Sequence, residues 1–115
     1  MVNVTLPWPH SDLWPNSRPH WSVLARHRRA AHRAAWLLCL DAGAPKGAAR
    51  LTVTLHPPRK PGRTNVDGCI GALKAAVDGI AQALGVDDSE LRIAWPETFA
   101  EPVAGGAVVV EIEPA

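Results

Sequence analysis

Acidic side chains and one lysine stand at the two ends of a segment whose pattern predicts a helix. Asp67 opens this segment, Lys74 lies within it, and the pair Asp87 and Asp88 follows it directly. Carboxylates with a neighbouring lysine are suited to holding divalent metal ions against a phosphodiester. The residue types and their order therefore indicate cleavage of nucleic acid.

Each of these residues also has a purely structural interpretation. Asp67 is typical of a helix cap, because a carboxylate there accepts backbone N–H groups and is favoured by the helix dipole. Lys74 lies almost two turns further on, at nearly the azimuth of Asp67 and at the border of the apolar face, where a lysine is often solvated. Asp87 and Asp88 are typical of an acidic turn before a strand. Since the ends of a straight helix of about 25 Å cannot meet, their convergence requires a second chain or a particular strand order.

Length and composition limit the class of protein. A chain of 115 residues with a formal net charge of +1 makes one domain, and its attraction for nucleic acid must come from local patches. Cys39 and Cys69 lack the paired spacing of a metal knuckle or a disulfide framework, and no apolar run approaches a membrane span. The first residues lack the pattern of a signal peptide. We therefore expect a cytoplasmic protein with reduced thiols and no membrane partner.

Hydrophobic periodicity predicts an α/β (α+β) fold over residues 1–115, with a mixed sheet, two helices and the order β-α-β-α-β-β. Strands are predicted where apolar and polar side chains alternate, and helices where apolar side chains recur every three to four residues. The predicted elements are strand 2–6, helix 20–42, strand 50–56, helix 67–84, strand 90–95 and strand 107–113. Prolines hold the segment between the first strand and the first helix in an irregular loop.

Two groups of basic residues are candidates for contacts with a phosphate backbone. The loop after the second predicted strand contains Arg59, Lys60 and Arg63. The first predicted helix carries Arg26, Arg29 and Arg33 on one face, with Arg28 and His32 nearby. A face of arginines on a surface helix is usually solvated, so the loop is the better candidate.

Tryptophans and histidines give weaker indications. The tryptophans of the proline-rich segment could stack on unpaired bases, although packing of that loop onto the sheet is the commoner role; they are Trp8, Trp14 and Trp21. No histidine has the spacing of a metal ligand, so surface or packing roles are expected for His10, His20, His27, His32 and His56.

Two parts of the chain resemble the RusA-like Holliday junction endonucleases of phages and prophages. Leu-Pro-Trp-Pro at 6–9 and Pro-Asn-Ser-Arg-Pro-His-Trp at 15–21 resemble the opening of that family. The segment 74–88 is similar to the family's Lys-Ala-x-x-Asp-x-(Ile/Leu) helix and to the Asp-Asp pair that follows it. Taken together in their order and spacing, these pieces extend the resemblance over nearly the whole chain.

The resemblance implies a small homodimer that nicks four-way DNA junctions in recombination and repair, using Mg²⁺ or Mn²⁺, in a bacterial host that carries a phage or prophage. Carried over by position, the catalytic residues are Asp67, Lys74 and Asp88. The implied metal ligands are Asp67, Asp88, Asp87 and Asn65. The implied DNA contacts are Asn16, Arg18 and His20, together with Arg59, Lys60 and Arg63.

This chain departs from the family signature Asp-x-Asp-Asn at two positions, where Asn65 and Gly68 replace the first Asp and the final Asn. An amide in place of a carboxylate removes a negative charge, so we expect a lower affinity for the metal. Mg²⁺ needs only one or two protein carboxylates, which leaves binding through Asp67 and Asp88 open. Two functions remain: a metal-dependent endonuclease on branched DNA, and a non-catalytic module that binds the same DNA.

Overall fold

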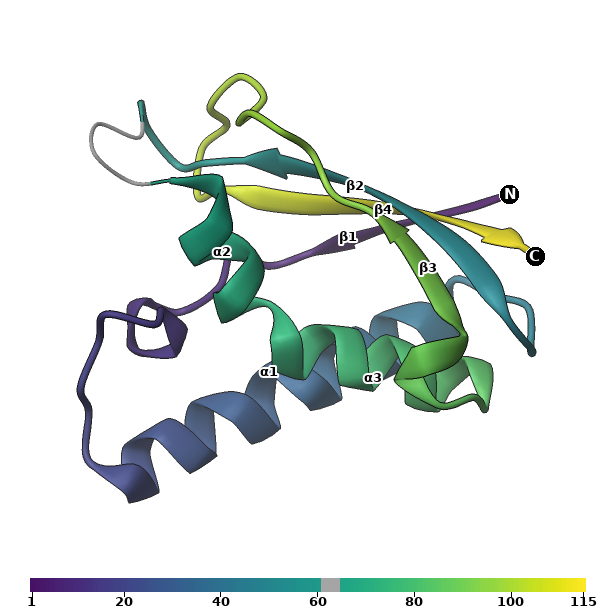
Figure 1. Ribbon diagram of the computed structural model, residues 1–115, viewed down its shortest axis with the longest axis horizontal. Coiled ribbons are helices and arrows are strands. Elements are labelled where there is room, and N and C mark those ends of the chain that lie inside the picture. Colours follow the sequence, from purple (N-terminus) through teal and green to yellow (C-terminus); the bar gives the residue numbers. More distant parts are fainter. Residues whose placement is uncertain (61–64) are drawn as a thin grey trace.

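A four-stranded mixed sheet carries a layer of helices on one face (Figure 1). The computed structural model describes residues 1–60 and 65–115 of this small α+β domain. Its elements are β1 (Val2–Leu6), α1 (Trp21–Asp41), β2 (Ala49–His56), α2 (Val66–Ala72), α3 (Lys74–Leu84), β3 (Leu91–Ala94) and β4 (Ala107–Pro114), with short 3₁₀ helices η1 (Ser11–Leu13) and η2 (Asp88–Glu90). The predicted mixed α+β fold and all four strands are confirmed.

The strands lie in the order β1-β4-β2-β3, so the last strand in the chain is central. β4 pairs antiparallel with both β1 and β2, whereas β2 and β3 run parallel. Val110 of β4 is level with Val4 on one side and Val53 on the other, and all three are buried. Because side chains alternate between the two faces of a strand, this register places one apolar face under the helices.

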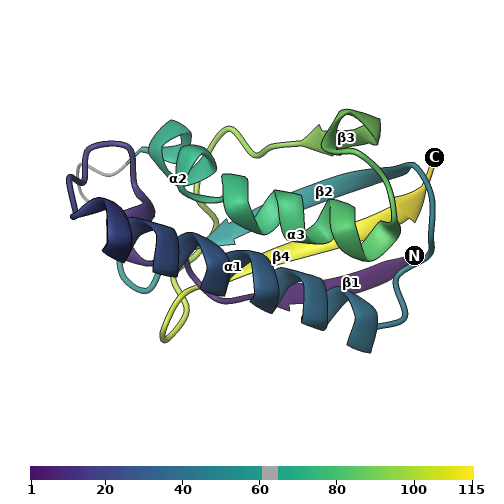
Figure 2. The ribbon, with the colours of Figure 1, turned by 90° about the horizontal axis from the view of Figure 1, so that it is seen from below.

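Helices α1 and α3 lie side by side on that face (Figure 2). Gly79 of α3 permits their close approach, since a Cβ at this position would collide with the carbonyl oxygen of His32 and lie 3.1 Å from the Cβ of Ala35. The side chains of His32 and Gln82 form a hydrogen bond across the same pair. At the end of α3, Lys46 Nζ donates a hydrogen bond of 2.6 Å to the carbonyl oxygen of Ala83.

Both cysteines are free and belong to the core beneath the helices. Each side chain is fully buried. Burial raises the pKa of Cys39 from 9.0 to about 11 and the pKa of Cys69 from 9.0 to about 12. Both thiols are therefore protonated at neutral pH, and their role in the structure is packing.

The predicted continuous helix 67–84 is wrong, because the segment forms two helices that meet at Leu73. The N–H of Leu73 bonds to the carbonyl of Ile70 at 3.1 Å, a tightened final turn, and the Leu73 side chain is buried. α2 and α3 consequently run in different directions (Figure 1). Lys74 begins α3, so it does not share a helical azimuth with Asp67.

In the part of the chain that the structure describes, no helix combines the length and the apolar character needed to cross a membrane.

Candidate functional site

The proline-rich segment after β1 packs against the start of α2. The ring of Trp14 lies so close to Gly68 that a Cβ on this glycine would be 3.2 Å from it. One residue further along the loop, Pro15 Cγ would be 2.9 Å from a Cβ on Gly71. These close approaches place the beginning of segment 15–21, which carries part of the RusA-like resemblance, beside α2.

Two of the three tryptophans in this segment have a packing role, as predicted. The ring of Trp8 lies 6.3 Å from that of Trp14 and 6.1 Å from that of Phe99, and all three are packed against the core. Trp21 differs, because it is 76% exposed at the start of α1. Of the candidate stacking residues, Trp21 therefore offers the largest free surface.

Asn65 is the N-cap of α2. Its Oδ1 accepts a hydrogen bond of 2.7 Å from the backbone N–H of Gly68. The capping role considered for Asp67 therefore belongs to Asn65. The carboxylate of Asp67 is exposed in the first turn of α2 and forms no hydrogen bond or ion pair with residues 1–60 or 65–115.

Gly68, which the sequence resemblance places at the final position of the signature, occupies a crowded position. A Cβ at Gly68 would lie 3.1 Å from Asn65 Oδ1, and it would also press on Trp14. A larger residue here requires both neighbours to shift. Gly68 therefore fits the local packing of this chain between the cap and the tryptophan.

Asp87 and Asp88 have different roles despite their adjacency. Asp87 caps η2, since its carboxylate accepts hydrogen bonds from the backbone N–H and the hydroxyl of Ser89, and Glu90 completes a capping box by accepting the N–H of Asp87 at 3.0 Å. The hydrogen bond from the Ser89 hydroxyl is the main cause of a lowered pKa for Asp87. Asp88 is exposed, and its carboxylate has no partner among the described residues.

One protomer does not bring Asp67 and Asp88 together. Asp67 precedes α3 and Asp88 follows it, and the 11 residues of α3 span about 16 Å. The start of α2 and η2 lie at opposite ends of this helix in Figure 1. The prediction that these carboxylates share a cation thus requires a second chain.

Lys74 is exposed at the first position of α3. It lines a hollow of about 310 Å³ together with Arg28 of α1 and Asp78 of α3. This hollow contains a cation from each helix and one carboxylate, which lies four residues after Lys74 on α3. The lysine is thus available to an external anion, but it is not held beside Asp67 by a shared helical face.

The candidate DNA contacts are exposed wherever the structure describes them. Arg59 and Lys60 line a groove of about 380 Å³ that Trp8 and Trp14 also border. In the loop before α1, Asn16, Arg18 and His20 are exposed. The ring of His20 also caps α1 by accepting the N–H of Ser22 at 3.2 Å. Arg63 lies outside the described residues.

Sequence reasoning missed one cluster, formed by His10, Asp12 and His27. Ligand atoms of these three side chains lie within 4.8 Å of one another. The spacing of the histidines alone gave no sign of this group, because folding brings the loop after β1 onto α1; the predicted surface or packing roles of His10 and His27 stay a prediction. The short spacing His10-x-Asp12 was the one indication of this cluster in the sequence. The third member, His27, lies fifteen residues after Asp12 in the chain.

The structure shows a small α+β domain in which the exposed carboxylate of Asp67 lies at the start of α2 and that of Asp88 follows α3. No family model matches the chain. An uncharacterized protein of Xylella fastidiosa (strain Temecula1) is 32% identical over an alignment of 118 positions, which covers 97% of this chain and 76% of that protein. The chain belongs to the same family as this Xylella protein.

Proposed function

We propose that the protein is a metal-dependent endodeoxyribonuclease that nicks branched DNA and acts as a homodimer. The observation that carries this proposal is the state of Asp67, whose exposed carboxylate is left without a partner by the described residues while Asn65 caps the helix. An unpaired carboxylate at a helix start is free to bind a cation. The RusA-like pattern of the sequence points to the same residue.

The surroundings of Asp67 support a DNA substrate. Arg59 and Lys60 precede α2 in the chain, and they share a groove with Trp14, which packs on the first turn of α2. Arg18 is exposed in the segment that follows Trp14. Basic side chains on neighbouring segments can position phosphates without requiring a strongly positive protein, which agrees with the net charge of +1.

The residues present fit Mg²⁺ as the metal. Mg²⁺ prefers oxygen ligands and commonly uses one or two carboxylates together with waters and substrate phosphate oxygens. Asp67 and Asp88 supply such carboxylates, and Asn65 retains an amide oxygen lone pair beyond the one that accepts the Gly68 N–H. When bound, the metal would activate a water and stabilise the charge that develops on the phosphate. Lys74 would add a positive charge for the phosphate.

The separation of the two carboxylates supports a homodimer. We infer that Asp67 of one chain acts with Asp88 of the partner chain, since α3 separates them within a protomer. In a two-fold symmetric dimer this arrangement creates two equivalent sites, one for each nicked strand. Exposed leucines near the end of α1 give each chain an apolar surface that a partner would cover; they are Leu37, Leu38 and Leu40.

A second function, a non-catalytic module that binds branched DNA, is favoured by one observation. The residue in the place of the first signature Asp is neutral, and its oxygen is already engaged in the cap of α2. The start of α2 therefore offers one carboxylate, Asp67, where the family pattern has two. In this alternative the basic groove retains DNA while the metal binds too weakly for cleavage.

A cleavage assay on a synthetic four-way junction distinguishes the nuclease from the non-catalytic binding module. The purified protein is incubated with the junction and with linear duplex in Mg²⁺ or Mn²⁺, and the products are separated on denaturing gels. We expect nicks in the junction that disappear in Asp67→Asn and Asp88→Asn variants. Asp41→Asn, which changes an exposed aspartate at the end of α1, serves as the matched control and should cleave normally. Retardation of the junction without any cleavage would instead establish the binding module.

A further inference from the structure

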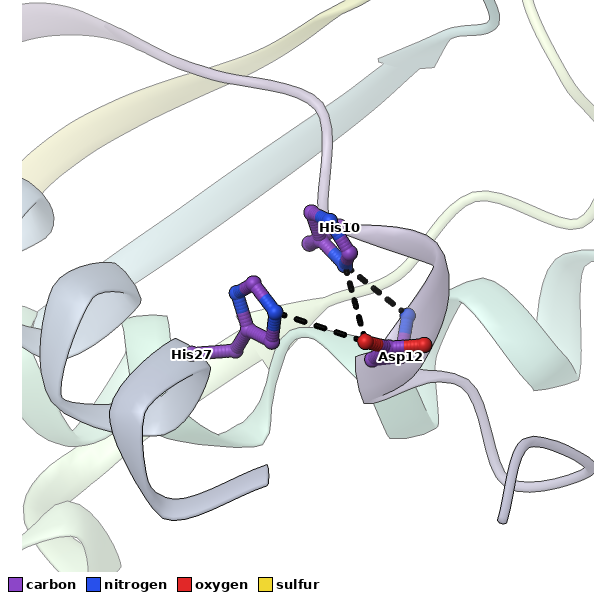
Figure 3. Close-up of side chains that lie close together, drawn as sticks. All are labelled: His10, Asp12 and His27. Carbon is purple, nitrogen blue, oxygen red and sulfur yellow. Dashed lines mark hydrogen bonds and ion pairs between the residues drawn. The ribbon is translucent and has the colours of Figure 1, made fainter. Parts of the chain in front are cut away.

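His10, Asp12 and His27 form a compact group at the junction of the proline-rich loop and α1 (Figure 3). Nε2 of His27 lies 3.3 Å from Oδ2 of Asp12, and Nδ1 of His10 lies 3.8 Å from the same oxygen. The two imidazole rings stack with centroids 3.7 Å apart and planes inclined by 16°. Two nitrogens therefore approach one carboxylate oxygen from neighbouring, nearly parallel rings.

The donor spacings are close to those of a shared metal ion, and one of the two stacked imidazoles must turn for both lone pairs to face that ion. Charge-assisted N–H···O bonds are usually about 2.7–2.9 Å long, and both nitrogen–oxygen distances here exceed that range. Two donors bound at about 2.0–2.1 Å to a tetrahedral ion lie about 3.3 Å from each other. The His27–Asp12 pair already has this spacing, and the His10–Asp12 pair needs to close by only a few tenths of an ångström.

The hydrogen bond that His10 makes shows where its Nδ1 lone pair points. Neutral imidazole is the form that binds metals, and Nδ1 of His10 already presents a lone pair here, since it accepts the backbone N–H of Asp12 at 3.1 Å. A metal ion would take over that lone pair.

The His10, Asp12 and His27 side chains are partly buried but remain accessible to solvent. The side chains of Asp12 and His27 are 31% and 21% exposed, whereas that of His10 is 51% exposed. His10 and His27 also line an apolar cavity of about 330 Å³ with Leu13 and Ala30. Three protein ligands leave a fourth position of a tetrahedral ion for water or another small ligand.

We propose that His10, Asp12 and His27 form a binding site for Zn²⁺ or a similar late first-row transition metal ion, which fastens the proline-rich loop to α1. A donor set of two imidazoles and one carboxylate favours such ions over Mg²⁺, which prefers oxygen ligands alone. The site is separate from Asp67 and Asp88 and does not depend on the proposed nuclease activity. Binding there would order the loop that contains Asn16 and Arg18.

Metal titration of the chelator-treated protein tests this site without DNA. We expect one Zn²⁺ per chain by calorimetry, visible ligand-field absorption when Co²⁺ is the probe, and a rise in melting temperature on Zn²⁺ addition. His27→Gln and Asp12→Asn should each weaken binding more than about 100-fold, beyond the roughly 10–100-fold typical of outer-shell partners. His56→Gln, a histidine in β2 outside the group, is the matched control.

Two further measurements keep the outcome clear. Circular dichroism and melting of each metal-free variant show whether it is folded, so that a lost site is distinguished from a lost fold. Asp67→Asn and Asp88→Asn should bind Zn²⁺ like the natural chain, even if they abolish cleavage. Zn²⁺ binding that is absent, or that is unchanged in both His27→Gln and Asp12→Asn, would overturn the proposal.

Discussion

The amide oxygen of Asn65 accepts the backbone N–H of Gly68 at 2.7 Å and thereby caps α2. Asn and Asp are equally strong N-cap residues. A carboxylate at position 65 would therefore keep this hydrogen bond and add a negative charge beside Asp67. The capping role and the metal-binding role of position 65 can thus be separated by substitution.

Asn65→Asp should increase metal-dependent cleavage of a four-way junction while leaving stability nearly unchanged. The added carboxylate raises the affinity for Mg²⁺, and the cap of α2 is retained. Asn65→Ala is the control that removes the cap, and it should lower the free energy of unfolding by about 1 kcal/mol. Nicking rates across a Mg²⁺ titration and urea unfolding of the three proteins provide the test. Equal rates for Asn65→Asp and the natural chain would show that position 65 does not serve the metal.

Asp87 and Asp88 should respond differently to the same substitution. Asp87 is engaged with Ser89, whereas Asp88 has no partner among the residues that the structure describes. We therefore expect Asp88→Asn to abolish cleavage and Asp87→Asn to retain most of it, because an asparagine can still cap η2. Parallel cleavage assays of the two variants decide the matter, and a reversed order of activity would contradict this assignment.

Gly79→Ala should destabilise the protein by roughly 1–3 kcal/mol, the usual range for overpacking. The new methyl group would meet the carbonyl oxygen of His32 and the Cβ of Ala35, at the closest approach of α1 and α3. Helix propensity alone predicts the opposite sign, a gain of about 1 kcal/mol. Urea unfolding therefore discriminates between the two effects, and an increase in stability would show that the helices are not packed as described.

High pH should destabilise the protein through its buried thiols. Burial raises the folded-state pKa values of Cys39 and Cys69 from the ordinary value of 9.0 to about 11 and about 12. Between pH 9 and 11 the unfolded chain loses thiol protons that the folded chain keeps, so the free energy of unfolding falls as pH rises. Cys39→Ala and Cys69→Ala should each flatten this decline, although each also leaves a cavity. A decline of equal slope in the natural chain and in both variants would rule out the thiols as its cause.

The regular elements were predictable because their signals are local. Alternation identified β2 and β4, and the helix periodicity with Gly43 beyond it identified α1. The break at Leu73 was not predictable, since the apolar stripe continues from α2 into α3 and the turn depends on burial of Leu73 in the core. The sequence likewise predicted a helix start at Asp67, but the N-cap of α2 is Asn65, two residues earlier.

The candidate sites were predictable only in part. The unpaired states of Asp67 and Asp88 depend on hydrogen bonds made by their neighbours, Asn65 and Asp87, which sequence does not reveal. The group around Asp12 was missed because His27 reaches it from another element. Contacts between segments distant in the chain are set by packing, for which local patterns carry no signal.

The central claim is that Asp67 of one chain acts with Asp88 of its partner, and subunit mixing tests it most directly. Inactive Asp67→Asn and Asp88→Asn proteins are unfolded together, refolded as a mixture and assayed on a four-way junction, in both the natural and the Asn65→Asp backgrounds. Half of the dimers are then mixed and contain one intact pair of carboxylates, so roughly a quarter of the unsubstituted activity should return. If mixed dimers form, as tagged copies would show, and no nicking returns, then the two carboxylates do not act across the dimer.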